Sequence, residues 1–503
     1  DKTGWMYARE RPETGSLMKL GWSSDGTVLA AGTGGGHVLM AETVGRVVEW
    51  ENWRVEQVDS TRLHVEDIVN EVEEDLEFRD RVVEMAMGHG QLVVATARQC
   101  HVYSVTNFHT PHTLDIRGAP SLMVLADRHF VLVTSVEGVR VVTYEARPRS
   151  TLRFAGIRVE FLNSNTLSLS SDTVALLDRT DNKTVRLFDA ESGRPVGVPI
   201  THNLDIQQVA LSLTGQPSLK DRRLVFLDRN KDLYITPVQR SQPMKLATMV
   251  DSFAWCDSCD ALAAVADGKL VFWLYPNAAF IDTDLLNSGM ETQDAGSLGK
   301  VPVITSFSAA RVTVRLASGT TTVMVAPAHA QLLHRSVHAG RWDEAVRLAR
   351  FVDQSSLWAA LAAMALNGRH LDTAEIALAA IAAVDKLHYV LHVKEIPSEA
   401  GRAAAMALFR REPDEAEQIL LQASPPHVYR AIKMNISLFR WRRALELATQ
   451  RNQFVDAVVG HRRRYLEGVG KPETDPEFLR HKDMAIDWTD IKQRAARAKE
   501  AER

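Results

Sequence analysis

The hydrophobic pattern changes its period near Pro327, and this change divides the chain into two parts of different fold class. Before Pro327, short runs rich in Val, Leu, Phe and Thr alternate with Gly, Asp, Asn and Ser turns, as around Val271 to Trp273. Such runs are typical of β-strands, and the lack of amphipathic helices between them argues against a doubly wound parallel sheet. After Pro327, apolar residues recur at helical spacing, as at Ala345, Leu348 and Ala349.

The strand-rich part repeats a unit of strand, polar turn, strand, Gly turn and strand. The clearest copies start at Leu20 and Phe253, and weaker ones start near Arg81, Pro120, Val159, Asp205 and Pro302. About seven units of roughly 40 to 60 residues fit the four-stranded blades of a β-propeller, in which each blade buries its faces against its neighbours. We therefore expect a β-propeller over residues 16–326, and residues 1–15 look like the end of an upstream propeller.

Two stretches interrupt the strand pattern. The segment from Glu66 to Arg81 is heavily acidic, and we expect a helix or an excursion between blades there. The segment from Ala278 to Lys300 is rich in Asn, Asp, Ser and Gly, which predicts a long surface loop.

The Ala-rich part, residues 327–503, contains a short helical pattern four times, with a central alanine at 345, 374, 416 and 444. A small side chain at a constant place lets two helices approach closely. The pattern predicts an irregular α-helical solenoid of tetratricopeptide-like hairpins. We expect these four alanines, together with Trp342 and Trp358, to pack between helices.

Composition narrows the function classes. Three cysteines in 503 residues exclude a disulfide scaffold, and a net charge of −4 gives no reason to expect a nucleic-acid-binding protein. The longest apolar run, Leu357 to Leu366, is too short to cross a bilayer, so we expect no membrane insertion.

No motif supports catalysis, a cofactor or a metal. Cys256 and Cys259 have the spacing of zinc ligands, but the remaining cysteine, Cys100, lies far away in the sequence, and four ligands are needed. His388 and His392 share a predicted helix face without the neighbouring Glu of a zinc protease. We predict a non-enzyme with no catalytic, cofactor or metal residues. An enzyme that uses the central channel of the propeller is the rival interpretation.

Two charged runs are candidate protein-interaction sites. From Arg430 onward there are 17 Lys and Arg against 11 Asp and Glu, a balance of +6, and the densest basic run is Arg462, Arg463 and Arg464. A solvated helix face or a contact with an acidic partner is favoured there over nucleic-acid binding. The acidic run contains Glu73, Glu74 and Asp75, for which a solvated face and a partner-docking segment both remain open.

A propeller followed by an Ala-rich solenoid is the architecture of coat-like scaffolds such as the coatomer α and β′ subunits. The local sequence carries a closer resemblance in eight segments, which are Leu76 to Val82, Lys231 to Thr236, Trp342 to Val352, Trp358 to Ala365, Thr373 to Ala377, Arg443 to Ala448, Gly470 to Thr474 and Ile486 to Trp488. In these segments the chain resembles the family of the eighty-kilodalton subunit of intraflagellar transport complex B.

The resemblance implies a structural subunit of the trains that move along ciliary microtubules. Its implied partners are other complex B subunits, with self-association as a further option, and the kinesin and dynein motors act on it indirectly. The implied location is the cilium or flagellum, at the axoneme and basal body, with a cytoplasmic pool. The family carries two propellers, so the first, which takes a calponin-homology domain, is expected to be absent from these residues. A vesicle-coat subunit is the alternative.

Overall fold

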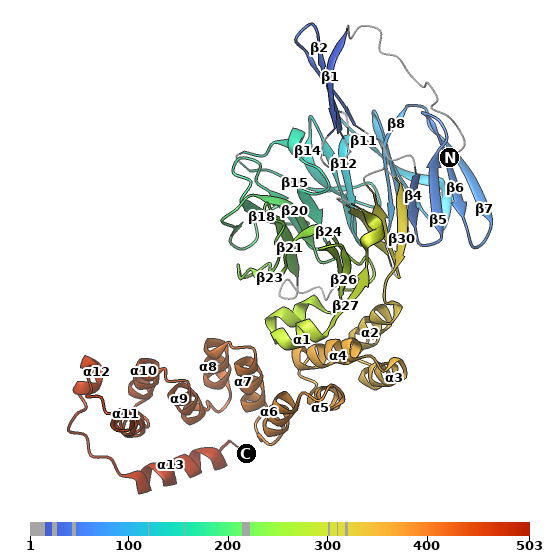
Figure 1. Ribbon diagram of the computed structural model, residues 1–503. Helices are drawn as coiled ribbons and strands as arrows, with labels where there is room; N and C mark the ends of the chain where they lie inside the picture. Colours follow the sequence, from blue (N-terminus) through green and yellow to red (C-terminus); the bar gives the residue numbers. More distant parts are fainter. Residues whose placement is uncertain are drawn as a thin grey trace. The chain divides into compact units, whose positions relative to one another are not determined.

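The computed structural model describes residues 16–22, 28–42, 47–118, 120–154, 156–213, 222–299, 302–308, 310–316 and 320–502 (Figure 1). The chain divides into two compact units. The first, a strand-rich unit, comprises Asp1–Trp273 and Glu291–Gln331, and the second, a helical unit, comprises Leu274–Met290 and Leu332–Arg503. The expectation for residues 1–15 lies outside the described residues.

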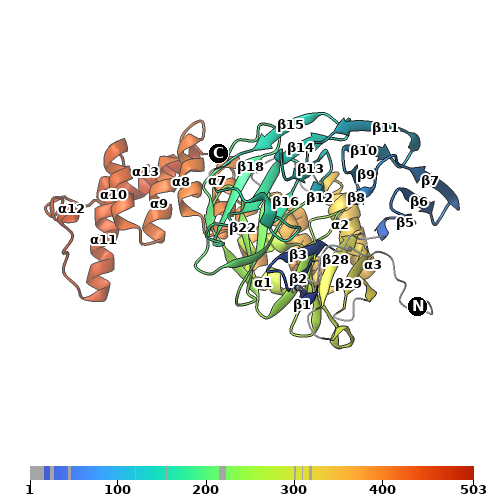
Figure 2. The same ribbon diagram turned by 90° about the horizontal axis from the view of Figure 1, so that it is seen from above.

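Seven antiparallel sheets of the strand-rich unit form the blades of a propeller (Figure 2). Six of these sheets have four strands each. The first three are β4(Val47–Trp50), β5(Trp53–Gln57), β6(Arg62–Asp67) and β7(Val72–Glu77); β8(Val82–Gly88), β9(Gln91–Thr96), β10(Gln99–Ser104) and β11(Asn107–Asp115); and β12(Pro120–Leu125), β13(His129–Thr134), β14(Gly138–Thr143) and β15(Pro148–Leu152). The next three are β16(Leu167–Leu169), β17(Thr173–Leu177), β18(Thr184–Asp189) and β19(Ile200–Thr201); β20(Ile206–Leu211), β21(Arg223–Asp228), β22(Leu233–Pro237) and β23(Met244–Ala247); and β24(Val250–Trp255), β25(Leu262–Ala266), β26(Lys269–Trp273) and β27(Met290–Asp294). The seventh has three described strands, β28(Val303–Ser308), β29(Arg311–Arg315) and β30(Thr321–Val325).

The blades surround a central channel. Its cavity of about 550 Å³ is lined by the first strand of every blade, from β4 through β8, β12, β16, β20 and β24 to β28. Between the last and first blades, the Arg311 guanidinium donates a hydrogen bond to the Glu51 carbonyl over 3.2 Å. The fold class predicted from the repeat, a propeller of about seven blades, is confirmed.

Strand β13 shows why the blades stack. All six of its residues are buried, because its two faces pack against different neighbours. Val131 and Val133 belong to a hydrophobic cluster shared with the blade of β16 to β18. Phe130 and Leu132 point to the opposite face and join a cluster shared with the blade of β8 to β10. A strand buried on both faces reads as a continuous apolar run, as this one does.

The acidic segment from Glu66 to Arg81 is not a helix or an excursion. It forms the end of β6 and the whole of β7, the outer half of the first blade. Cross-strand pairing overrides the low strand propensity of its acids, since Leu76 is buried while most of the acids stay exposed. The copy at Leu20 lies in a separate sheet of β1(Leu17–Trp22), β2(Val28–Thr33) and β3(Val38–Glu42), whose described residues do not line the channel.

The segment from Ala278 to Lys300 is not a long loop either. It contains the end of the 3₁₀ helix η2(Pro276–Phe280), then α1(Thr283–Ser288), β27 and η3(Gly296–Leu298). The Asp282 carboxylate caps α1 by accepting hydrogen bonds from the Asp284 and Leu285 amides, both over 3.0 Å. Leu285 is buried in the helical unit, which stabilises this short helix.

The helical unit is a solenoid of short antiparallel hairpins. Its helices after β30 are α2(Ala328–His338), α3(Trp342–Val352), α4(Ser355–Asn367), α5(Leu371–Ala380), α6(Val384–Lys394), α7(Glu399–Phe409), α8(Pro413–Gln422), α9(Val428–Ser437), α10(Trp441–Arg451), α11(Val455–Val469), α12(Pro476–Leu479) and α13(Trp488–Glu500). The predicted packing alanines at 345, 374, 416 and 444 are all fully buried, and Trp358 is 6% exposed. Among the described residues, no helix is long and apolar enough to span a membrane.

The packing of α5 leads to a stability prediction. We expect Ala374→Leu to lower the free energy of unfolding by about 1–3 kcal/mol, because a fully buried alanine between helices leaves no room for a larger side chain. Ala379→Leu on the exposed side of the same helix is the matched control, with an expected change within about 0.5 kcal/mol. Urea titration followed by circular dichroism measures both, and equal midpoints for the two variants would contradict the assignment.

Candidate protein-interaction surface

The turn between α9 and α10 places an aromatic side chain on the surface. Phe439 has φ +58°, a left-handed conformation that ends α9 and lets α10 begin at Trp441. The turn is closed by hydrogen bonds from the Phe439 amide to the Ile436 carbonyl and from the Arg440 amide to the Asn435 carbonyl, over 3.1 and 2.9 Å. The side chain of Phe439 is left 60% exposed.

Phe439 is one of three aromatic residues that contact one another, and we call them the aromatic cluster. The ring centroids of Phe439 and Trp441 are 5.9 Å apart, those of Phe439 and Tyr465 5.2 Å, and those of Trp441 and Tyr465 5.4 Å. Tyr465, on α11, is 40% exposed. Tilted rings at these distances stabilise each other and form a rigid apolar surface.

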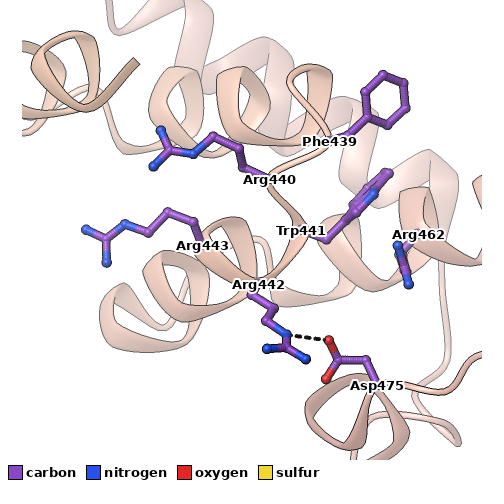
Figure 3. A pocket seen from close by; sticks show the side chains of 7 residues that line it. All are labelled: Phe439, Arg440, Trp441, Arg442, Arg443, Arg462 and Asp475. Atoms are coloured by element: carbon purple, nitrogen blue, oxygen red, sulfur yellow. Dashed lines mark hydrogen bonds and ion pairs between the residues drawn. The ribbon is translucent and has the colours of Figure 1, made fainter. Parts of the chain in front are cut away.

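Arginines line a shallow cavity of about 340 Å³ together with Phe439 and Trp441 of the aromatic cluster (Figure 3). The four members of this arginine rim are Arg440, Arg442, Arg443 and Arg462. Figure 3 shows Arg462 beside Trp441, and the guanidinium lies 5.5 Å from the indole centroid. Arg, Trp and Tyr are the residue types that most often dominate binding energy at protein interfaces.

Carboxylates hold every arginine of the rim. The ion pairs are Arg440–Asp414 at 2.5 Å, Arg442–Asp475 at 2.7 Å, Arg443–Glu417 at 2.6 Å and Arg462–Glu473 at 2.9 Å. The hydrogen bond from Arg462 holds the pKa of Glu473 below its usual range, and the one from Arg442 does the same for Asp475. These ion pairs hold the guanidinium groups in place and balance their positive charge. The surface therefore carries little net charge, and its main features are its shape and its exposed aromatic rings.

The predicted basic run lies at one edge of this surface. Arg462 belongs to the rim, whereas Arg463 donates hydrogen bonds to the His481 and Lys482 carbonyls over 3.0 and 2.6 Å. The Arg464 guanidinium lies 4.6 Å from the ring centroid of Trp488. All three arginines thus bind the chain's own C-terminal segment, and their role toward a partner stays a prediction.

That segment turns back along the solenoid, with α13 passing beneath α11 and α9 in Figure 1. Gly460 allows the close approach, because a Cβ there would lie 3.0 Å from Ile486 and 3.1 Å from Trp488. At the far end, Glu502 is 2.6 Å from both Arg430 and the Ser398 hydroxyl. The solenoid therefore already binds one extended segment, which is the C-terminal segment of the same chain.

The predicted acidic residues lie in the strand-rich unit, on β7. Glu73 and Asp75 are exposed, and Glu74 is half-buried. Asp75 accepts a hydrogen bond from His64 Nδ1 over 2.9 Å, which raises the pKa of His64, and Glu74 lies 3.8 Å from His109. These neighbours fit a solvated outer strand, and docking at this strand stays a prediction.

The candidates for metal binding and catalysis are placed as follows. Cys256 and Cys259 are buried thiols after β24 that form no disulfide, and His388 and His392 are exposed on α6. Among the described residues, no group of three or more His, Cys, Asp and Glu side chains is arranged to hold a metal ion. In the channel, the Ser308 hydroxyl donates directly to the Asp257 carboxylate over 2.6 Å.

Sequence reasoning missed the aromatic cluster and most of the arginine rim. The signal was present in the run Phe439-Arg440-Trp441-Arg442-Arg443, which interleaves aromatic and basic residues at the start of a helix. The density of basic residues, taken by itself, points to Arg462 to Arg464 instead.

A β-propeller followed by a tetratricopeptide-like solenoid places the chain in the class of repeat proteins that combine these two architectures. The "IFT80 second beta-propeller" model matches residues 45–329, and the "IFT80/172/WDR35/WDR19 TPR domain" model matches residues 357–503. The chain therefore belongs to the family of intraflagellar transport protein 80.

Relatives of known name agree. The chain is 42% identical over 500 residues to the intraflagellar transport protein 80 homolog of Rattus norvegicus and 41% identical to that of Mus musculus. These alignments cover 98% of the chain and 64% of each relative. It is also 21% identical over 318 residues to the intraflagellar transport protein 172 homolog of Mus musculus, covering 58% of the chain and 17% of that relative. The chain thus spans less than two thirds of the length of the two intraflagellar transport protein 80 homologs, and the family match does not favour the vesicle-coat alternative.

Proposed function

We propose that the protein is a non-catalytic scaffold subunit of intraflagellar transport complex B, needed for train assembly, anterograde transport and cilium assembly. It acts at the axoneme and basal body of the cilium or flagellum and is supplied from a cytoplasmic pool. Its direct partners are other complex B subunits, and kinesin and dynein motors move it indirectly. Family membership supports the pathway, and the two repeat architectures support the scaffold role.

The observation that carries this proposal is the exposed aromatic cluster within its arginine rim. Phe439 and Tyr465 are 60% and 40% exposed, although burying an aromatic ring is strongly favourable. Ion pairs already fix the surrounding arginines, so a partner that covers this surface loses little side-chain freedom on binding. The solenoid joins the protein to the train through this surface.

The test is the double variant Phe439→Glu and Tyr465→Glu, expressed as the full chain in ciliated cells that lack the protein. We expect its co-purification with complex B subunits to fall at least about tenfold, because truncating an interface hot spot costs about 2 kcal/mol or more. Cilium assembly should fail with it. The thermal midpoint of the purified variant shows whether the fold is retained.

Phe351→Glu is the matched control, since Phe351 is an 89% exposed phenylalanine on α3 of the same unit. The control should assemble like the unchanged protein. Normal incorporation of the double variant would contradict a contact at the aromatic cluster, and normal cilia in cells without the protein would contradict the scaffold role.

A further inference from the structure

Two of the three cysteines lie in the short connection between β24 and β25. Cys256 directly follows β24, and Cys259 comes three residues later, before β25 begins at Leu262. The Cys256 amide donates a hydrogen bond to the Ala261 carbonyl over 2.9 Å, which closes the connection into a tight turn. Both side chains belong to the hydrophobic cluster that this blade shares with the seventh blade, so the turn directs both thiols to the same side.

The two thiols are hydrogen-bonded to each other. The Cys259 thiol donates to the Cys256 sulfur, and this bond lowers the pKa of Cys256 and, together with burial, raises the pKa of Cys259. The Ser258 hydroxyl, 3.3 Å from the Cys256 sulfur, adds to the first effect, whereas burial and the Asp257 carboxylate oppose it. Two sulfurs at hydrogen-bonding distance need only a small further approach to reach the length of about 2 Å of a disulfide bond.

Cys100 provides a contrast within the same unit. It lies on β10, is fully buried, and packs in an apolar cluster with Phe130 and Leu132. Burial raises its pKa to about 12. A cysteine in apolar surroundings with a raised pKa is an unreactive, structural thiol, because the thiolate is the reactive form.

A small reagent has only a short way to the thiol pair. Cys256 and Cys259 are 0% and 3% exposed, but Ser258 between them is exposed, and Asp257 lines the central channel. A local movement of this turn therefore brings solvent to the sulfurs, and local openings of this kind require less free energy than global unfolding. Hydrogen peroxide is small enough to enter through such an opening.

We propose that Cys256 and Cys259 are a redox-active pair that hydrogen peroxide converts to a disulfide within the turn. The Cys256 sulfur attacks one peroxide oxygen, the O–O bond breaks, and the released hydroxide takes the thiol proton and leaves as water, which gives a sulfenic acid. The Cys259 sulfur then attacks the Cys256 sulfur, the S–O bond breaks, and a second water leaves with the Cys259 proton. The two thiols lose two electrons and two protons, and one peroxide is reduced to two waters.

The pair lies where the sixth blade meets the seventh. The Asp257 amide donates to the Phe307 carbonyl over 3.1 Å, and the Asp257 carboxylate accepts from the Ser308 hydroxyl over 2.6 Å. A disulfide from Cys256 to Cys259 constrains the backbone that carries both hydrogen bonds. Oxidation therefore acts on the contact between these two blades, and this chemistry is independent of the scaffold role proposed above.

The first test treats the purified full chain with hydrogen peroxide, denatures it in iodoacetamide and digests it with trypsin. Both cysteines fall in one peptide, residues 246–269, because no Lys or Arg lies between them. We expect this peptide to lose two hydrogen atoms and to take up no label, at least about tenfold faster than Cys100 loses its label. Dithiothreitol should restore both labels. Full labelling of the pair after peroxide, sulfinic acid in place of the disulfide, or an equal rate at Cys100 would overturn the proposal.

The second test assigns the order of attack. In Cys259→Ser we expect a sulfenic acid to persist at Cys256 and to be trapped by dimedone, whereas in Cys256→Ser the remaining Cys259 should stay unmodified. Cys100→Ser is the matched control and should form the disulfide at an unchanged rate. Trapping at Cys259 in Cys256→Ser, with none at Cys256 in Cys259→Ser, would overturn the assigned order. The thermal midpoints report whether the variants fold, and the first test, on the unchanged chain, decides the proposal even where a variant does not.

Discussion

Replacing Glu417 by Ala is expected to lower the free energy of unfolding of the helical unit by about 3 kcal/mol. The Glu417 side chain is 5% exposed and accepts hydrogen bonds from Arg443 over 2.6 and 3.0 Å. It also accepts from the fully buried Asn435 over 2.8 Å. One carboxylate on α8 thus joins α9 and α10, and it raises the pKa of the Arg443 guanidinium.

The expected loss has two parts. The Asn435 amide loses a partner in a place that water does not reach, which costs about 1–3 kcal/mol. The Arg443 side chain is 41% exposed, so its charge regains some hydration, and this keeps the total near the lower end of the range for breaking buried pairs. The helical unit should unfold at a lower urea concentration, followed by circular dichroism at the helical band.

Glu446→Ala is the matched control, because Glu446 contacts the same Arg443 over 3.0 Å from an exposed position on α10. Its loss should cost less than about 1 kcal/mol. Glu417→Gln, which can still accept from Asn435, should fall between the two. Similar midpoints for Glu417→Ala and Glu446→Ala would mean that burial does not strengthen this ion pair.

Acidification is expected to destabilise the helical unit through His334 by about 3 kcal/mol between pH 6.5 and pH 4. His334 on α2 is 3% exposed, and its Nε2–H donates to the Leu274 carbonyl over 2.7 Å. Burial lowers the pKa of His334 from 6.5 to about 4, and His338 adds a smaller effect in the same direction. The fold therefore favours the neutral imidazole.

The sign follows from proton binding. Between pH 4 and pH 6.5 the unfolded chain binds the proton that the folded chain refuses, so stability is complete above the unfolded pKa and falls as the pH drops through this window. His334→Gln keeps a donor for the Leu274 carbonyl but does not titrate. Urea midpoints measured across the window should converge for the two proteins as the pH falls. Parallel pH profiles would contradict a neutral, buried His334.

The alternation of apolar and polar residues is a local property, and it sufficed to predict most of the fold. The period change near Pro327 separates β30, which ends at Val325, from α2, which begins at Ala328. The alanines at 345, 374, 416 and 444 were recognisable because close helix packing requires a small residue at a constant place. The propeller and the solenoid are thus both predicted by patterns that repeat along the sequence.

The errors came where long-range pairing outweighs local preference. The acids of β7 have low strand propensity, yet pairing with β6 makes them the outer strand of a blade. The aromatic cluster joins Phe439 of the α9–α10 turn and Trp441 of α10 to Tyr465 of α11, which lies far from them in the sequence.

What the sequence by itself determined is the order of the two repeat architectures and the side chains that fill their cores, because hydrophobic period and residue size act within a few residues. Only the tertiary structure decided which charged and aromatic groups remain available for partners. Arg463 and Arg464 are bound to the chain's own C-terminal segment, whereas the side chain of Phe439 is 60% exposed. The exposure of a side chain depends on which other parts of the chain pack over it, and these contacts form only in the complete tertiary structure.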